Sequence, residues 1–329
     1  WRTIYRDGQK QGASTVKICV AGAAGAFGRK HLQAITAINE VKVVSVVDTI
    51  PDSIQDLAKE QHIEHWATDL NESLARPDIE AVILATPTPL HAAQAIQCLQ
   101  SGKHVLVEIP MAETLVDAES IVKTQRETGR IAMAGHTRRF NPSHQWVHHR
   151  IASGELNIQH LVVQTYFFRR SNLNALGQPR SWTDHLLWHH ACHTVDLFQY
   201  QTGETVNKIQ ALQGPVHPEL GIAMDMSISL QVPSGATCSL SLSFNNDGPL
   251  GTFFRYICDN GTYIARYDDL VDGYENPVDL SGIAESQNGI ELEDREFFSA
   301  IREGREPSSS VAECLPAMRT LDLIEKQLQ

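Results

Sequence analysis

The sequence lacks three features that would each indicate a particular class of protein. Its six cysteines stand singly among 329 residues, without a Cys-x-x-Cys pair, which argues against a disulfide framework or zinc ribbon and favours a reducing cytoplasm. It has neither an apolar run long enough to span a membrane nor a signal-peptide pattern, so we expect no membrane partner. The net charge of −12 argues against a nucleic-acid partner, because phosphate binding needs a basic surface.

The length suggests about two domains. Residues 1–15 are polar and without periodicity, and we predict that they form an N-terminal extension outside the fold. The 42% of hydrophobic residues is ordinary for a globular protein and is enough for sizeable cores.

The first half opens with a strand, a glycine turn and a helix. The β-branched run Val16–Val20 leads into the turn, and a helical pattern follows over Arg29–Ile38. Glycines allow the backbone to approach a dinucleotide pyrophosphate, which then lies at the helix N-terminus. The spacing is GxxGxxG, one residue longer than the usual motif, and a simple βα turn is the alternative. The predicted cofactor-binding residues of this turn are Gly22, Ala24, Gly25, Ala26, Phe27 and Gly28.

A second apolar strand, Val41–Val47, ends in Asp48, twenty residues after Gly28. A carboxylate at this place can accept hydrogen bonds from the ribose hydroxyls and repel a 2′-phosphate, so Asp48 favours NAD over NADP. The alternative is an Asp that only caps or faces solvent, because the turn 49–52 follows directly.

Further short apolar runs at 81–85, 104–107 and 131–134 alternate with helical patterns. This alternation predicts an α/β fold with a doubly wound parallel Rossmann sheet over residues 16–137. Ligands of such sheets lie beyond the carboxyl ends of the strands. We therefore add to the cofactor site the residues that follow these strands, namely Thr86, Pro87, His91, Glu108 and Pro110.

The alternation stops after Pro142. Strand-like segments then dominate, at 159–169, 208–213, 223–231, 237–244, 252–258 and 262–267. We predict a C-terminal α+β domain over 138–329, with a large, open and mostly antiparallel sheet that carries the substrate site. One face of an open sheet needs a cover, so we expect a homo-oligomer, a dimer or tetramer.

The stretch Trp182–Leu197, WTDHLLWHHACHTVDL, is predicted to be one helix with Thr183 or Asp184 as its N-cap. At about 100° per residue, one narrow face is polar and the opposite face is apolar. The polar face holds His185, His189, His193 and Asp196. Neutral imidazoles suit proton transfer, although the same histidines could serve only packing.

The pair His189 and His193 also has the spacing of zinc ligands, with His185 one turn before. However, the glutamate that follows the first histidine in zinc proteases is replaced here by His190. We therefore expect no metal, and keep a metalloenzyme as an alternative.

Arginines gather at three places, as an acidic protein needs if it binds an anionic substrate. They are Arg138, Arg139, Arg169, Arg170 and Arg180. Guanidinium groups match carboxylates, so we predict that they bind a small anionic dicarboxylate; surface salt bridges are the alternative. Within a strand, Arg169 and Arg170 point to opposite faces, so at most one faces the site. Tyr166, Trp182, Thr183 and Asn246 are further candidate lining residues.

Several of these motifs resemble the Gfo/Idh/MocA oxidoreductases, from about Val16 to the C-terminus. The shared motifs are the glycine turn, Ala85-Thr86-Pro87 with His91, Glu108-x-Pro110, the run Arg138–Pro142, His193 with Asp196, and the segment 296–307. The blocks GHTRRFNPSHQWVH and RSWTDHLLWHHACHTVDL are similar to a bacterial subgroup that acts in protocatechuate 4,5-cleavage. That subgroup oxidises the cyclic hemiacetal of a ring-cleavage semialdehyde to a pyrone dicarboxylate with NAD or NADP.

The resemblance implies roles for the histidines. His193 occupies the family's catalytic position and is the preferred base, with Asp196 orienting it. The family's usual Glu-Lys-Pro is Glu108-Ile109-Pro110 here, and its usual Asp four residues before the catalytic histidine is His189. The pyrone-forming subgroup shares both changes. His189 could orient the base, bind the hydroxyl or be the base itself.

Two other functions remain open at this point. The chain could be a dehydrogenase of a sugar or other cyclic hydroxyl compound. It could also be a nucleotide-binding member of the family that lost catalysis together with the lysine.

Overall fold

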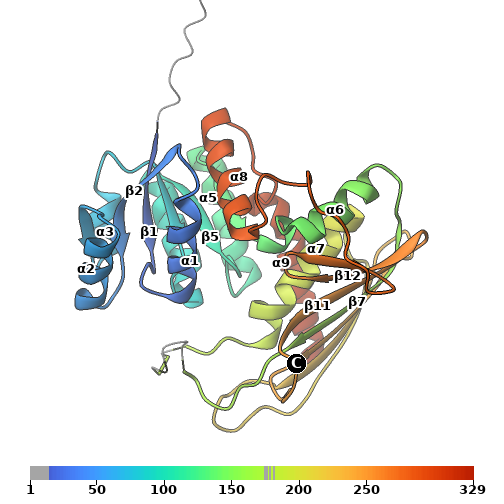
Figure 1. Ribbon diagram of the computed structural model, residues 1–329. Helices are drawn as coiled ribbons and strands as arrows, with labels where there is room; N and C mark the ends of the chain where they lie inside the picture. Colours follow the sequence, from blue (N-terminus) through green and yellow to red (C-terminus); the bar gives the residue numbers. More distant parts are fainter. Residues whose placement is uncertain (1–14, 174–176, 178, 181) are drawn as a thin grey trace, which may run out of the picture.

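The computed structural model describes residues 15–173, 177, 179–180 and 182–329. The predicted N-terminal extension, except for Thr15, therefore lies outside the described residues. Two sheets lie side by side, each with its own helices (Figure 1).

The first sheet is parallel throughout, in the order β3-β2-β1-β4-β5-β6. Its strands are β1 (Val16–Ala21), β2 (Val41–Val47), β3 (His65–Ala67), β4 (Ala81–Leu84), β5 (His104–Glu108) and β6 (Ala132–Gly135). Its helices are α1 (Ala26–Ile35), α2 (Pro51–Glu60), α3 (Leu70–Leu74), the 3₁₀ turn Thr88–Leu90, α4 (His91–Gln100) and α5 (Leu115–Thr128). This is the strand order of the dinucleotide-binding fold, and the predicted doubly wound sheet is confirmed.

The second sheet has the order β13-β12-β11-β7-β10-β9-β8 and is antiparallel except for the pair β7 and β10. Its strands are β7 (Ile158–Tyr166), β8 (Lys208–Gln213), β9 (Asp225–Gln231), β10 (Thr237–Ser243), β11 (Gly251–Cys258), β12 (Gly261–Arg266) and β13 (Asp269–Asp272). The helices of this half are the 3₁₀ turn Thr137–Arg139, α6 (Pro142–Ala152), α7 (Cys192–Thr202), α8 (Gly289–Glu303) and α9 (Val311–Leu328). The predicted, mostly antiparallel sheet is confirmed.

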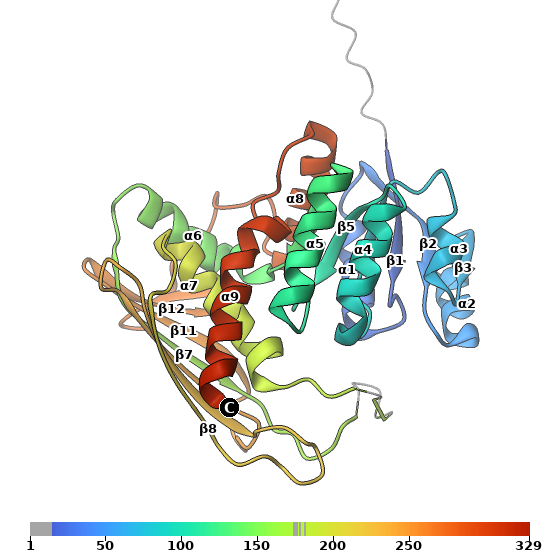
Figure 2. The ribbon, with the colours of Figure 1, turned by 180° about the vertical axis from the view of Figure 1, so that it is seen from behind.

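Helices α6, α7 and α9 cover one face of the second sheet, and the opposite face carries no helix among the described residues (Figures 1 and 2). Strand alternation follows this arrangement. In β10, Cys238, Leu240 and Leu242 are buried beneath the helices, whereas Ser239 and Ser241 lie partly exposed on the uncovered face. The core of this domain therefore lies between the sheet and its helices.

The C-terminal part of the chain returns to the first domain. Helix α8 packs against α1, and α9 packs against both α5 and α7. The backbone N–H of Ala134 donates to the carbonyl of Ser309 at 2.9 Å, and the Ser309 hydroxyl donates to the carbonyl of Ala134 at 2.9 Å. Residues after 285 thus tie the two halves together.

The prediction of one helix over Trp182–Leu197 is wrong at its start. His185 has extended backbone, with φ −121° and ψ 162°, and helical structure begins at Leu186 as a wide π-helical segment to Ala191. Helix α7 follows directly. A π-turn holds more residues than an α-turn, so the spacing of about 3.6 residues does not apply to His185 and His189. Asp184 binds arginines, described below, and is not the helix cap.

All six cysteines are buried and free, as their single spacing predicted. In the described part of the chain, no helix combines the length and the apolar character that crossing a bilayer would require.

Candidate functional site

The glycine turn between β1 and α1 has no room for side chains. Gly22 has φ +75°, and a Cβ there would lie 2.3 Å from the carbonyl oxygen of Ala85. A Cβ on Gly28 would lie 2.2 Å from the carbonyl oxygen of Gly22. Gly25 precedes α1 in extended conformation and provides no side-chain cap, so the first amides of α1 are left for an anion. This cradle fits a dinucleotide pyrophosphate.

Asp48 lies against the same turn. Its Oδ2 accepts the backbone N–H of Ala24 at 3.0 Å, and its Oδ1 accepts that of Thr49 at 2.8 Å. Each carboxylate oxygen can accept a second hydrogen bond, so contact with a ribose remains open to Asp48. Residues 49–52 contain no basic side chain that would bind a 2′-phosphate.

Two predicted cofactor residues are held inside the protein. His91 is buried between the carbonyl oxygens of Pro110, 2.8 Å from Nδ1, and Thr86, 2.7 Å from Nε2. It therefore fixes the loops after β4 and β5 relative to each other. Glu108 turns inward to His31, with 3.0 Å between Oε1 and Nε2, so the structure does not offer its carboxylate to a cofactor. The exposed Phe27 lies in the first turn of α1, and the exposed Pro87 lies in the loop after β4.

His31 belongs to a buried cluster between α1, β5 and α8. Its Nδ1 lies 2.9 Å from Oδ1 of Asp294, while its Nε2 faces Glu108. Burial alone would lower the pKa of His31, but the two carboxylates raise it well above its ordinary value. Glu293 is fully buried in the same cluster, both of its oxygens lack a partner among the described residues, and burial raises its pKa well above the usual range.

His189 is enclosed by aromatic and polar neighbours. The ring of Trp182 stacks on it, with 5.4 Å between centroids and 21° between planes, and Arg180 lies 5.3 Å above Trp182. Its Nδ1 accepts the backbone N–H of His185 at 3.1 Å, and its Nε2 lies 3.6 Å from Oε1 of Glu113. Burial, and then the neighbouring His185, lower the pKa of His189 to about 3.

Three groups of described residues bring possible metal-ligand atoms within 4.8 Å of one another. They are Glu113 with His185 and His189, His136 with Asp196 and Cys314, and His31 with Glu293 and Asp294. The first group pairs His189 with His185, and does not include His193. Because Nδ1 of His189 accepts an N–H, its proton lies on Nε2, and a protonated nitrogen is no metal ligand. This geometry gives the metalloenzyme alternative no support.

His193 is half-buried near the start of α7. Its Nδ1 is buried without a partner among the described residues, and the ring of His136 stands 6.5 Å away, edge to face. Burial, followed by the charge of Arg138, lowers the pKa of His193 well below its ordinary value. His193 is therefore neutral at physiological pH and free to accept a proton.

Asp196 forms an ion pair with Arg139. The structure gives no support to the predicted role of Asp196 in orienting His193. Nε and Nη2 of Arg139 donate to the two oxygens of Asp196 at 2.8 and 2.6 Å, and Nη1 donates to the carbonyl of Ser308 at 2.6 Å. Arg139 is only 5% exposed. Its donors already have partners, so this geometry does not support binding of a substrate carboxylate by Arg139.

A second arginine set forms around Asp184. Arg169 binds it with both Nη atoms, and Arg180 donates from Nη1 to Oδ1 at 2.8 Å. Burial would raise the pKa of Asp184, but hydrogen bonds from His190 and Arg169 hold it well below the usual range. Two guanidinium groups share one carboxylate, so the set keeps a positive charge. Arg170 is exposed and donates to Asn245 at 3.1 Å. Because β7 ends at Tyr166, neither Arg169 nor Arg170 lies in a strand, and the predicted alternation does not apply to them.

The remaining predicted lining residues are dispersed. The hydroxyl of Tyr166 donates to Ser241 at 3.1 Å on the uncovered face of the sheet, because its position in β7 alternates with the buried Thr165. The side chain of Asn246 donates to the carbonyl of Pro249 at 3.0 Å within its own turn. Neither joins the histidines. Thr183 is partly exposed beside Asp184.

Four residues of the site were missed from the sequence. They are His31, Glu113, His136 and His144, each of which lies outside the histidine-rich stretch. His136 and His144 flank the arginine pair 138–139, so their proximity to it was a usable signal. Only the tertiary fold brings His31 and Glu113 to their partners.

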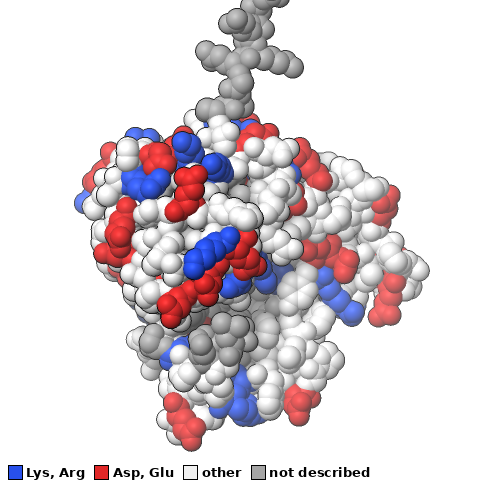
Figure 3. All heavy atoms as spheres, turned by 60° about the vertical axis from the view of Figure 1, so that its left-hand side comes forward, with Lys and Arg blue, Asp and Glu red and all other residues white. Residues whose placement is uncertain are grey.

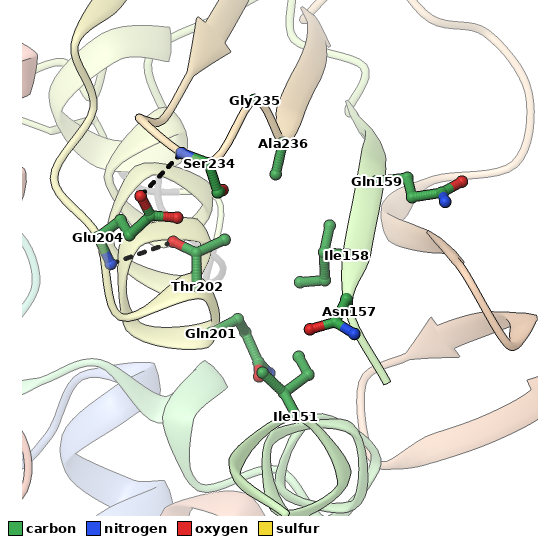
Figure 4. Close-up of a pocket in the computed structure, with 10 residues that line it drawn as sticks. All are labelled: Ile151, Asn157, Ile158, Gln159, Gln201, Thr202, Glu204, Ser234, Gly235 and Ala236. Atoms are coloured by element: carbon green, nitrogen blue, oxygen red, sulfur yellow. Dashed lines mark hydrogen bonds between the residues drawn. The ribbon is translucent and has the colours of Figure 1, made fainter. Parts of the chain in front are cut away.

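Two cavities lie away from these residues. One, of about 420 Å³, lies at the C-terminal end of α7 and is lined mainly by polar side chains and turn residues, including Gln201, Thr202, Glu204 and Ser234 (Figure 4). The other, of about 430 Å³, lies beside α8, where Arg295, Arg302 and Arg305 are each paired with glutamates. On the face seen in Figure 3, basic and acidic side chains are likewise intermingled.

Comparisons with known proteins agree with this architecture. A family model described as "Oxidoreductase family, NAD-binding Rossmann fold" matches residues 16–136, and "Bacterial oxidoreductases, C-terminal" matches residues 142–284. The 4-carboxy-2-hydroxymuconate-6-semialdehyde dehydrogenase of a Sphingobium species is 62% identical over 95% of this chain and 99% of that protein. The scyllo-inositol 2-dehydrogenase (NAD(+)) of Bacillus subtilis is 26% identical over 68% of this chain and 65% of that protein.

Solved structures show the same fold. An oxidoreductase domain protein from Kribbella flavida has a TM-score of 0.82 at 19% identity, covering 95% of this chain and 97% of that one. Levoglucosan dehydrogenase in complex with NADH and levoglucosan has a TM-score of 0.81 at 20% identity, covering 95% and 96%. From its family matches and its full-length relative, the chain belongs to the Gfo/Idh/MocA family of oxidoreductases.

Proposed function

We propose that this protein oxidises the cyclic hemiacetal of 4-carboxy-2-hydroxymuconate-6-semialdehyde to 2-pyrone-4,6-dicarboxylate in protocatechuate 4,5-cleavage, as an NAD-dependent dehydrogenase. The observation that carries this proposal is the 62% identity to the Sphingobium enzyme over nearly the whole of both chains. The neutral histidines and the arginine set around Asp184 agree with an anionic substrate whose hydroxyl must lose a proton.

The chemistry divides between hydride and proton. Bound NAD accepts the hydride at its nicotinamide ring. His193 takes the hydroxyl proton of the hemiacetal, because it is neutral and its Nδ1 has no partner among the described residues. His189 presents an N–H from Nε2 and hydrogen-bonds a substrate oxygen. The family's lysine is Ile109 here, so an imidazole takes the place of an ammonium group in this step.

Three further properties belong to the proposal. Asp48 favours NAD over NADP, since it stands beside the glycine turn with no basic neighbour at 49–52. The six free thiols suit a reducing cytoplasm. The uncovered face of the second sheet is available to a second copy of the chain in a dimer or tetramer.

The test is reduction of NAD, followed by NADH absorbance at about 340 nm, with the semialdehyde generated in situ from protocatechuate. We expect rapid reduction with this substrate, a slower rate with NADP, and no effect of a chelator. Inositols and levoglucosan serve as comparison substrates. Faster turnover of one of these, or none with the semialdehyde, would reject the proposed reaction.

A further inference from the structure

Arg138 differs from the other arginines of the predicted site. Arg139, Arg169 and Arg180 each form an ion pair, whereas Arg138 forms none with the described residues. Its Nη1 donates to Oδ1 of Asn141 at 3.3 Å, and its Nε is buried without a partner among those residues. Arg138 is partly buried, and its guanidinium carbon lies 4.7 Å from the ring centroid of Tyr267. Partial removal of a cation from water without a counter-ion is unfavourable, so this position calls for an anion.

His144 lies beside the same aromatic ring as Arg138. The ring centroids of His144 and Phe254 are 4.7 Å apart, and the guanidinium carbon of Arg138 lies 5.9 Å from the Phe254 centroid. His144 is 1% exposed, and its Nδ1 lies 2.7 Å from the hydroxyl of Tyr256. When Tyr256 donates to Nδ1, Nε2 carries the proton, and this Nε2 is buried without a partner among the described residues.

His193 completes the group. It lies at the start of α7, which packs against the 3₁₀ turn that carries Arg138 and against α6, which carries His144. In agreement with this packing, burial and then the charge of Arg138 lower the pKa of both His144 and His193. The carboxylate whose charge acts on Arg138 is that of Asp268, whose Oδ1 accepts from Nδ2 of Asn141 at 2.6 Å. Asn141 therefore stands between the two charges. Arg138, His144 and His193 present unpartnered nitrogens without a carboxylate among them.

We infer that Arg138 and His144 form a partly buried subsite for one carboxylate of the substrate, adjacent to the base His193. This inference rests on the proposed function. In 2-pyrone-4,6-dicarboxylate, the two carboxylates stand on either side of the reacting carbon, each one atom removed from it in the ring. One enters the subsite of Arg138 and His144, and the other meets Arg169 and Arg180 around Asp184. Charge-assisted hydrogen bonds at both ends hold the hydroxyl at His193.

Pyridine-2,4-dicarboxylate is a suitable probe, because its carboxylates have the same relative positions and it undergoes no oxidation. Its dissociation constant is measured by calorimetry on the protein loaded with NADH, beside those of pyridine-2-carboxylate and pyridine-4-carboxylate. We expect the wild type to bind the dicarboxylate more tightly than either monoacid. Arg138→Met should weaken the dicarboxylate by about 10- to 100-fold, to the level of one monoacid.

The second variant and the control sharpen this result. His144→Phe keeps a ring against Phe254 and should weaken dicarboxylate binding by about 10-fold. Arg126→Met, which changes an exposed arginine of α5, should leave it unchanged. Equal dicarboxylate affinity in Arg138→Met and Arg126→Met would overturn the inference, as would a wild type that does not distinguish the dicarboxylate from the monoacids.

Thermal unfolding separates binding from structure. Removal of a partly buried charge without an ion-pair partner should leave the Tm of Arg138→Met unchanged or higher. A Tm several degrees lower would make Arg138 structural and overturn the inference. Because the probe needs no turnover, failure to oxidise the semialdehyde, with the binding results intact, would reject the proposed reaction and leave the carboxylate subsite standing.

Discussion

The backbone N–H of His185 donates to Nδ1 of His189 at 3.1 Å. A backbone amide can only donate, so Nδ1 holds the lone pair and the proton of the neutral ring lies on Nε2. His189 therefore faces Glu113 with a hydrogen-bond donor, 3.6 Å from Oε1. His193 has no such constraint, and the two histidines of the predicted catalytic pair have different roles.

Replacement of these histidines by glutamine and leucine should separate their roles. His193→Gln should lower kcat by about 10²- to 10⁴-fold and leave NADH affinity intact, because it removes the base and no cofactor contact. Glutamine at position 189 keeps an N–H donor, so His189→Gln should retain much more activity than His189→Leu. Steady-state kinetics and NADH fluorescence titration measure both effects. Equal damage from His189→Gln and His189→Leu would instead assign the base to His189.

The pH dependence of turnover should lack the usual histidine limb. The pKa of His189 lies at about 3 and that of His193 well below 6.5, so both rings remain in the neutral form as the pH falls to about 5.5. A base with an ordinary pKa would lose about 90% of its active form there. We expect kcat to fall by less than about twofold between pH 7.5 and 5.5. Circular dichroism at each pH checks that the protein is folded, and a tenfold loss in a folded sample would contradict the assignment.

Arg139 should behave as a structural residue. Arg139→Met leaves Asp196 buried without its bidentate partner, and we expect a loss of about 3–5 kcal/mol in the free energy of unfolding. The double variant Arg139→Met with Asp196→Leu should recover much of that loss. Urea denaturation measures both. A fully stable Arg139→Met whose only defect is a raised KM would return Arg139 to the substrate site.

The local pattern of apolar and polar residues was sufficient to predict most of the fold. Unbroken apolar runs, such as Ala81–Leu84 in β4, predict strands that are buried on both faces. The helices between these strands require parallel pairing. β3, with three residues, and α3, with five, are too short to show a period and were missed. β13, which has four residues between turns, was missed for the same reason.

The site was less predictable, because side-chain partners come from distant parts of the chain. Helical periodicity put Asp196 on the face of His193, but Arg139, 57 positions away, binds it. The π-helical segment at Leu186–Ala191 has no recognisable sequence pattern and displaced His185 from that face. The strand predicted to reach Arg169 ends at Tyr166, so strand alternation did not apply to Arg169 and Arg170.

The buried contacts of His31 with Asp294 and Glu108 should make the free energy of unfolding fall at alkaline pH. The folded-state pKa of His31 is raised above the ordinary 6.5, so its stabilising contribution is complete below about pH 6.5 and disappears as the pH rises through the folded-state pKa. His31→Gln should cost about 3–5 kcal/mol at pH 6 and progressively less at higher pH. Urea denaturation at pH 6 to 10 measures this trend. A constant difference across that range would show that His31 is not protonated in the folded state.

Asp48 should determine the choice between the two dinucleotides. Asp48→Ala removes the acceptor of the ribose hydroxyls and the charge that repels a 2′-phosphate, so NAD should bind about tenfold more weakly while NADP gains or keeps its affinity. Fluorescence titration with NADH and NADPH measures the two dissociation constants separately. Asp52→Ala, at an exposed position in the first turn of α2, is the matched control and should change neither. Asp48 also accepts the N–H of Ala24, so an equal loss of both cofactors would mean that it only holds the glycine turn.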